Sequence, residues 1–270
     1  MSALQEGLYD LGRLDRLSYK DTPVHRLDPR AKVFTTLVFI VCVVSFGKYD
    51  LVPMLPFVVF PVVMAAEGDL PVGFVLRKLL AVAPFALLVG VFNPLLDREV
   101  LVQIGGLGIS GGWISYASII ARFFLTTFTA LILIATTSFA GVCMALGRLG
   151  VPDVLVTQLL LLYRYIFVLG EETMRMARAR ALRSFGTKGM ELRAYVQILG
   201  HLLLRTYARA ERVYRAMLGR SFDGQVRIAR ALRFEVRDAV FVLGWSAVFV
   251  TFRLVNVPLE IGRLVTGVLS

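Results

Sequence analysis

Two short stretches of this chain carry an arginine followed by small and aromatic residues in the same order. Arg183–Gly186 reads Arg-Ser-Phe-Gly, and Arg220–Gly224 reads Arg-Ser-Phe-Asp-Gly. The guanidinium of arginine is planar and permanently charged, so it pairs in bidentate fashion with a carboxylate of another protein. The repeat therefore predicts two groups that bind a partner.

The same letters also describe the end of an α-helix. Arginine suits the negative end of the helix macrodipole, glycine can take the left-handed cap conformation, and phenylalanine can cover an apolar stripe. Capping alone does not explain why a similar ending occurs twice in one charged block. Because a cap can also present its arginine, we expect both roles. The small neighbours Ser184, Gly219 and Ser221 would let each arginine enter a groove.

Each arginine follows a long helical pattern. Before the first, the apolar run 154–169 continues through Glu171 and Glu172 to Arg175, with charged pairs at helical spacing. Before the second, apolar residues recur in steps of three and four. They form one stripe: Val196, Leu199, Leu203, Tyr207, Ala210, Tyr214 and Met217. The pattern predicts two helical arms, each ending at an arginine.

Composition points to a membrane protein. Hydrophobic residues make up 57% of the chain, more than a globular domain usually carries. Residues 171–238 hold fifteen Lys or Arg against seven Asp or Glu, a net charge of +8 out of the total of +11. Such a concentration of positive charge beside apolar runs is the bias expected of a cytoplasmic loop. It argues against nucleic-acid binding and predicts a cytoplasmic basic block.

Five apolar runs are predicted to cross the membrane in an all-α fold: 33–46, 51–66, 79–92, 117–139 and 241–257. The first two are shorter than the roughly 20 residues that a span needs, and a re-entrant hairpin is the alternative for them. Asp28 and Pro29 predict the start of the first helix, as N-cap and first helical residue. Gly47–Asp50 is expected to be a turn. Arg122, in the fourth run, is expected to reach the outer interface or to bind a partner helix.

Two connections between these runs differ in composition. Residues 67–78 are polar, and residues 93–112 are rich in glycine and poor in charge, which suits the outer side of the membrane. A cytoplasmic N-terminus followed by four crossings leaves the chain in the cytoplasm at Ala140. A crossing by 154–169 would put the basic block outside, so we expect this run to pack against the bundle without crossing.

The predicted organisation has three parts. Residues 1–139 hold the N-terminal tail and four spans, residues 140–238 form a cytoplasmic coupling domain with both arms, and residues 239–270 hold the last span and a tail.

The sequence lacks the motifs of common enzyme classes. It contains no G-x-x-x-x-G-K-[ST] loop for ATP, no HExxH or GxSxG motif and no cysteine pair spaced for a metal. His25 and His201 stand apart in cationic company, and Cys42 and Cys143 lie far apart in apolar sequence. We expect no catalytic residue, no metal site and no cofactor, and partner binding as the function.

At its two arginines the chain resembles the T components of energy-coupling factor (ECF) transporters. These carry two X-Arg-X motifs, commonly Ala-Arg-Gly, in a cytoplasmic coupling domain. The matching positions here are Leu182, Arg183 and Ser184, and Gly219, Arg220 and Ser221. Segments 25–32 and 209–214 are similar to the cobalt-type, CbiQ-like branch. The departures are serine in place of the final glycine, and leucine or glycine in place of alanine.

The resemblance implies a non-catalytic subunit of an ATP-driven importer for cobalt or nickel in the cell (inner) membrane. Such a T component lies in membrane lipid and bridges two ABC ATPase subunits and a substrate-specific S component that binds the metal. Each arginine would dock in a groove of one ATPase. The main alternative is a conventional ABC permease subunit that forms the substrate path itself and normally offers one coupling helix per chain. A membrane enzyme and a membrane anchor for nucleic acid or acidic lipid are further alternatives.

Overall fold

The computed structural model describes residues 7, 9, 12, 13, 15–96, 100–104, 107–183, 192–224, 226 and 234–255. These residues are mostly helical, and the chain falls into two compact units. The membrane unit comprises Asp15–Val142 and Leu232–Ser270, and the arm unit comprises Met1–Leu14 and Cys143–Ala231. The divisions fall at 142 and 231, whereas the sequence predicts boundaries at 139 and 238.

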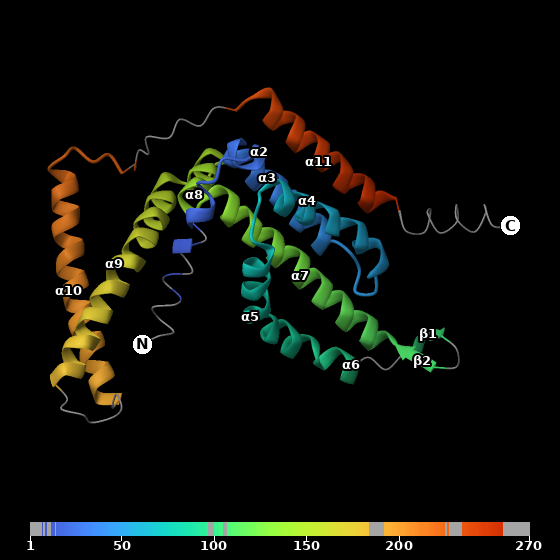
Figure 1. Ribbon diagram of the computed structural model, residues 1–270, viewed down its shortest axis with the longest axis horizontal. Helices are drawn as coiled ribbons and strands as arrows, with labels where there is room; N and C mark the ends of the chain where they lie inside the picture. The colour runs from blue at the N-terminus through green and yellow to red at the C-terminus, as the bar shows by residue number, and fades with distance from the viewer. Residues whose placement is uncertain are drawn as a thin grey trace. The chain divides into compact units, whose positions relative to one another are not determined.

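Helices account for most of the described chain, which confirms the predicted all-α class (Figure 1). The membrane unit contains, in order, α2 (Pro23–Arg26), α3 (Pro29–Val44), the 3-10 helix η1 (Val52–Val58), α4 (Val59–Glu67), α5 (Val72–Gly90), α6 (Phe92–Leu96), β1 (Val100–Ile104), β2 (Leu107–Ser110), α7 (Gly111–Thr137) and α11 (Val236–Leu254). The chain passes into the arm unit within α8 (Phe139–Arg148), and α9 (Asp153–Arg183) and α10 (Leu192–Leu218) follow there.

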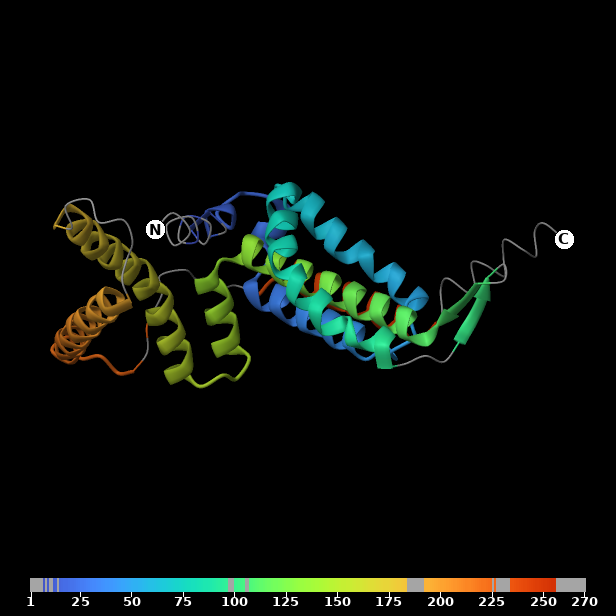
Figure 2. The same cartoon turned by 90° about the horizontal axis from the view of Figure 1, so that it is seen from below.

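The first long helix begins where the sequence predicts. Asp28 is the N-cap of α3, its carboxylate accepts a hydrogen bond from the Arg30 N–H at 2.8 Å, and Pro29 takes the first helical position. The predicted turn also forms, because the Gly47 N–H donates to the Asp50 carboxylate at 2.9 Å. Figure 2 shows α3, in dark blue, alongside α7, in green.

Two arginines from other helices bind the chain just after α3. Arg122 of α7 donates to the Gly47 carbonyl and, at 3.2 Å, to the Ser118 hydroxyl. Arg253 of α11 donates to the Ser45 hydroxyl at 2.9 Å and to the Ser45 carbonyl at 3.1 Å. Cations at the C-terminal end of a helix satisfy carbonyls that have no partner in the helix. Arg122 therefore has a role inside its own chain, which the sequence does not predict.

Aromatic rings from α3, η1, α4 and α11 form the core of the membrane unit. Phe249 lies 5.3 Å from Phe39 and 5.0 Å from Phe60, measured between ring centroids, and Phe60 lies 4.9 Å from Trp245. Phe39, Phe57, Phe60 and Phe249 are all buried. Each such pair is worth about 0.5–1.5 kcal/mol beyond the area it buries. The rings therefore join the first helices of the chain to the last one.

Both connections contain regular structure. The stretch 67–78 is not a polar connection throughout, because α5 starts at Val72 and carries Arg77 and Lys78 within it. Lys78 lies over the Phe74 ring at 5.6 Å, so a long cationic side chain covers apolar surface without breaking the helix. In the glycine-rich stretch, β1 and β2 pair in an antiparallel hairpin with Val102 opposite Ile109. This hairpin is the one departure from helix and irregular structure among the described residues.

Three helices of the described chain are long and apolar enough to cross a membrane: Val72–Pro94, Gly111–Thr137 and Asp153–Arg183. At 16 residues, α3 is about 24 Å long and falls short of a hydrocarbon core of about 30 Å. The five crossings stay a prediction. The inference that 154–169 does not cross also stays a prediction, and it rests on charge, because α9 has the length and apolarity of a span.

Candidate docking site

The first predicted arm ends at its arginine. The 31 residues of α9 finish at Arg183. Arg183 is exposed, and its neighbour Leu182 is 83% exposed although it is apolar. Ser184, the third residue of the first motif, lies outside the described residues. The described part of the motif, Leu182 and Arg183, is therefore exposed at the last turn of α9.

The second arginine occupies the capping position of α10. The N–H of Phe222 donates to the Met217 carbonyl at 3.1 Å, and the N–H of Ser221 donates to the Leu218 carbonyl at 3.0 Å. Together with a positive φ of 57° at Ser221, these bonds form a Schellman motif with Arg220 as the C-cap. Arg220 and Ser221 are exposed.

The left-handed residue of this cap is not the one that the sequence suggests. The sequence predicts that the glycine at the end of Arg220–Gly224 takes the left-handed conformation, and Gly224 does have a positive φ of 91°. The helix itself, however, is terminated by Ser221. At this position the motif of the resembling family commonly has glycine, and this chain has serine. A left-handed conformation costs an L-residue roughly 1–2 kcal/mol, which glycine avoids.

The loop after Arg220 is fixed to the start of α9. The Thr157 hydroxyl donates to the Gly224 carbonyl at 3.0 Å. Between the two helices lies a mainly apolar cleft of about 620 Å³, lined by Phe222, Met217 and Leu162 among others. Phe222 thus packs beside the stripe of its own helix, as the sequence predicts. Sequence reasoning misses the contact of Thr157 with this loop, because Thr157 lies in an apolar run without a distinguishing motif.

The two helices of the arm unit run antiparallel, so the arginines are not brought together. Glu172 of α9 pairs with Arg205 of α10 at 2.7 Å, and Thr157 bonds beyond the end of α10. Arg183 therefore lies near the start of α10 and Arg220 at its other end (Figure 1). A helix of 27 residues is about 40 Å long, which sets the scale of their separation.

Arg175, Arg205 and Arg215 of the arm unit form ion pairs within the chain. Arg175 pairs with Glu171 and Arg215 pairs with Glu211, both one turn away on the same helix. Within the described part of the chain, Arg183 and Arg220 make no ion pair. No carboxylate of the described residues therefore pairs with either guanidinium group.

The apolar stripe predicted on α10 is largely uncovered. Val196 is 61% exposed, Leu203 is 70% exposed and Tyr207 is 73% exposed. Toward its C-terminal end the stripe does reach the cleft, which Ala210, Tyr214 and the half-buried Met217 line together with Val213 from a neighbouring line along the helix. The helix therefore carries more apolar surface than α9 covers.

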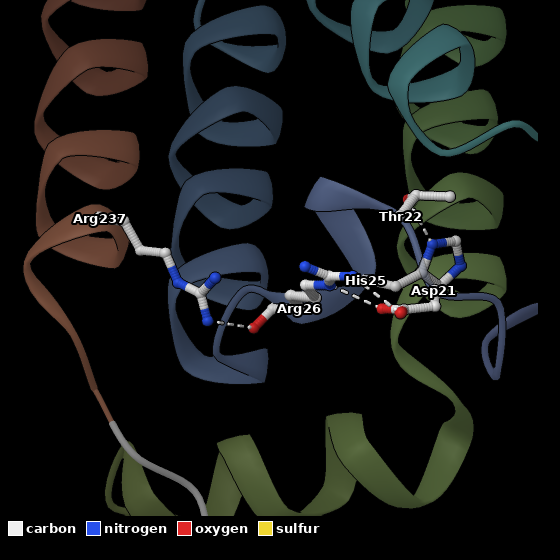
Figure 3. A network of polar contacts seen from close by, with 5 residues as sticks. All are labelled: Asp21, Thr22, His25, Arg26 and Arg237. Atoms are coloured by element: carbon white, nitrogen blue, oxygen red, sulfur yellow. Dashed lines mark hydrogen bonds and ion pairs between the residues drawn. The ribbon is translucent and has the colours of Figure 1, made fainter.

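The described residues contain no group of three or more His, Cys, Asp or Glu that could hold a metal. His25 is buried, and its Nδ1 lies 2.7 Å from the Thr22 hydroxyl (Figure 3). Burial and, after it, the nearby ammonium of Lys32 lower the pKa of His25. His201 is exposed on α10.

These features define an all-α polytopic membrane protein in which a helical unit carries two exposed arginines that form no ion pair with any described residue. Comparison with known proteins agrees with the resemblance seen in the sequence. Residues 20–229 match the family described as cobalt transport protein, CbiQ. The chain belongs to this family.

Three relatives illustrate the breadth of the family. The energy-coupling factor transporter transmembrane protein EcfT of Heliobacterium modesticaldum is 28% identical over 251 residues, which cover 85% of this chain and 92% of the relative. The cobalt transport protein CbiQ of Rhodobacter capsulatus is 34% identical over 132 residues, 47% of this chain and 54% of the relative. The nickel permease LarQ of Lactiplantibacillus plantarum is 29% identical over 103 residues, 38% of each chain. At the level of the family, the chain is a T component of the ECF type, a membrane component of a transporter and not an enzyme.

Proposed function

We propose that this protein is the energy-coupling T subunit of an ECF-type ABC importer for cobalt or nickel. It binds two ABC ATPase subunits through Arg183 and Arg220 and transmits their closure to a metal-binding S component in the membrane. The first docking motif is Leu182, Arg183 and Ser184, and the second is Gly219, Arg220 and Ser221.

The observation that carries this proposal is the placement of the two arginines. Both are exposed, both lie at the end of a long helix, and neither makes an ion pair within the described chain. Because α10 separates them by about the length of 27 residues, they suit two separate acidic grooves better than one. Two docking points on one chain also favour a coupling subunit over a conventional permease subunit.

Energy and metal are supplied by partners in this proposal. The sequence has no P-loop, so ATP is bound and hydrolysed by the ATPases. The described residues offer no cluster of metal ligands, so the S component binds the ion. The relatives named for cobalt and for nickel support either metal as cargo.

The proposed location is the cell (inner) membrane, with the N-terminus and the arm unit in the cytoplasm and lipid around the membrane unit. The charge of residues 171–238 supports this orientation, since positively charged loops are retained on the cytoplasmic side. A labelling tag after Gly189 is expected to react only from the cytoplasm. Labelling from outside would mean that α9 crosses the membrane.

Charge reversal tests the docking sites. Arg183→Glu and Arg220→Glu are each expected to weaken co-purification of the ATPase, and the double variant is expected to abolish metal uptake while the protein stays in the membrane. The loss of a charged hydrogen-bonded pair, replaced by repulsion, corresponds to about 2–5 kcal/mol per site. Arg212→Glu, on the exposed side of α10, is the matched control and should retain both activities.

Uptake measurements also distinguish a coupling subunit from a permease subunit. Normal uptake and normal ATPase co-purification by the double variant would contradict the proposal. A permease subunit that forms the path itself would import metal with its ATPase alone, so uptake without an S component would favour that alternative.

A further inference from the structure

The first turn of α3 lies where several helix ends of the membrane unit meet. Asp238, in the first turn of α11, is 1% exposed, and its carboxylate accepts from two backbone N–H groups. These belong to Asp28, at 2.9 Å, and to Glu235, at 2.8 Å, which are the N-caps of α3 and α11. One buried carboxylate therefore fixes the starts of two helices that are far apart in the sequence.

The segment before α3 is held by the same end of α11. Arg237 donates to the Arg26 carbonyl at 3.1 Å, and Arg26 makes a bidentate pair with Asp21 at 2.7 and 2.8 Å (Figure 3). In Figure 3, Arg237 reaches from the first turn of α11 to the short helix that precedes α3. The segment before α3 is thus held by Arg237 of α11 and by Asp21 of its own segment.

Lys32, one turn into α3, joins this cluster to the end of α7. Its side chain is among the most buried of the described residues, with Lys32 2% exposed. The ammonium donates to the Thr136 carbonyl at 2.8 Å, in the last turn of α7. Burial of an ammonium is costly, and its favourable position is at the negative C-terminal end of a helix. Lys32 therefore fastens the end of α7 to the start of α3.

The chain changes direction sharply at Ser138, the residue between α7 and α8. Ser138 has a φ of 63° and is 5% exposed. Its N–H donates to the Ile134 carbonyl at 3.1 Å, so it completes α7, while its hydroxyl accepts from the Gly141 N–H at 3.1 Å and caps α8. A left-handed conformation at a buried serine is strained and persists only where the surroundings hold it.

This junction is the route by which the chain leaves the membrane unit. The division between the units falls within α8, directly after Val142. A Cβ on Gly141, in the first turn of α8, would lie 3.2 Å from the Thr137 side chain and 3.8 Å from Pro29. The first turn of α8 is therefore packed against the same start of α3 that carries Lys32.

We propose that Lys32 is a positioning residue for the α7–α8 junction and that Ser138 is its hinge. Lys32 holds the last turn of α7 to α3, so a displacement that enters through α8 moves α3, α7 and α11 together. Without the hydrogen bond from Lys32 to the Thr136 carbonyl, the α7–α8 junction bends at Ser138 and the displacement does not reach the other helices. The inference rests on the proposed function, because the displacement originates in the ATPases.

The test uses the whole transporter reconstituted in vesicles and measures metal imported per ATP hydrolysed. Lys32→Met keeps the length of the side chain and removes the donor. ATPase co-purification and ATP hydrolysis are expected to persist, while the import ratio falls about tenfold, a size typical of coupling between sites. Lys32→Arg, which keeps a donor, should restore part of the ratio. Lys20→Met, which breaks an exposed ion pair with Asp69, is the control and should leave the ratio unchanged.

Each outcome decides the inference. A wild-type import ratio in Lys32→Met overturns it. If that variant fails to reach the membrane, Ser138→Ala decides, because it removes the α8 cap without touching the buried charge. A reduced ratio in Ser138→Ala supports the hinge, and a wild-type ratio overturns it. A wild-type chain that purifies without an ATPase overturns the proposed function and this inference with it, whereas normal wild-type coupling with unchanged variants overturns this inference alone.

Discussion

The membrane unit and the arm unit are both built from apolar helices, but they use their cations differently. In the membrane unit, Lys32, Arg122 and Arg253 donate to backbone carbonyls near the ends of neighbouring helices. In the arm unit, Arg205 pairs with a glutamate, while Arg183 and Arg220 make no ion pair with any described residue. Cations therefore stabilise the first unit from within, whereas Arg183 and Arg220 of the second unit can bind a partner.

The two units also differ in how they bury apolar side chains. The rings of Phe39, Phe60 and Phe249 interlock in the membrane unit. The arm unit has an open cleft between α9 and α10 and leaves Leu203 70% exposed on a helix that also carries Arg205 and Arg209. Apolar side chains beside arginines suit contact with protein better than contact with lipid tails. The comparison supports a membrane unit that moves as one body and an arm unit completed by its partners.

The largest effect is expected from the aromatic core. Phe249→Ala should destabilise the membrane unit by about 3–5 kcal/mol, since truncation leaves a cavity between several rings. The loss is measured as a fall in the thermal stability of the purified full-length chain. Leu203→Ala in the arm unit is the matched control and should change stability by less than about 0.5 kcal/mol. Equal losses in the two variants would contradict the proposed difference between the units.

A smaller effect is expected from the support of the second arginine. Thr157→Val removes the hydroxyl that binds the Gly224 carbonyl and should cost about 1 kcal/mol, or roughly fivefold in ATPase affinity. Titration of the ATPase onto the purified subunit measures this change. Thr173→Val, whose hydroxyl bonds the Leu169 carbonyl of its own helix, serves as the control. Equal affinities for the two variants would show that the loop does not position Arg220.

The smallest effect is expected at the cap of α10. Ser221→Gly should stabilise this helix end by about 0.5–1 kcal/mol, because glycine adopts a φ of 57° without a Cβ clash. Ser221→Val should have the opposite effect, since a β-branched residue is poorly tolerated there. Hydrogen exchange of the amides in the last turn of α10 reports both changes. Slower exchange in the valine variant than in the glycine variant would refute the assigned cap.

Local features were predictable from the sequence. The start of α3 at Pro29 follows from an N-cap aspartate and a proline, and the end of α9 at Arg183 follows from a helical pattern that stops there. Both signals lie within a few residues of the feature they specify. The membrane class and the two arginines of the docking motifs are likewise visible in composition and repetition.

Features that depend on distant residues were not predictable. Lys32 reads as part of a polar N-terminal segment, yet it is buried because the end of α7 supplies a carbonyl for its ammonium. Asp238 bonds the Asp28 N–H across 210 residues of sequence. The exposed line on α10 could not be told from the half-buried one, since both are apolar at helical spacing. Only the packing of α9 separates them.

Cross-linking tests the central claim most directly. In a chain with Cys42 and Cys143 replaced by alanine, Arg183→Cys and Arg220→Cys together are joined to ATPases that carry a cysteine in their docking grooves. Two docking sites per chain predict a product containing one copy of this protein and two of the ATPase, and each single-cysteine chain should give a product with one. A double-cysteine chain that captures only one ATPase would contradict the claim that the two arginines serve separate partners.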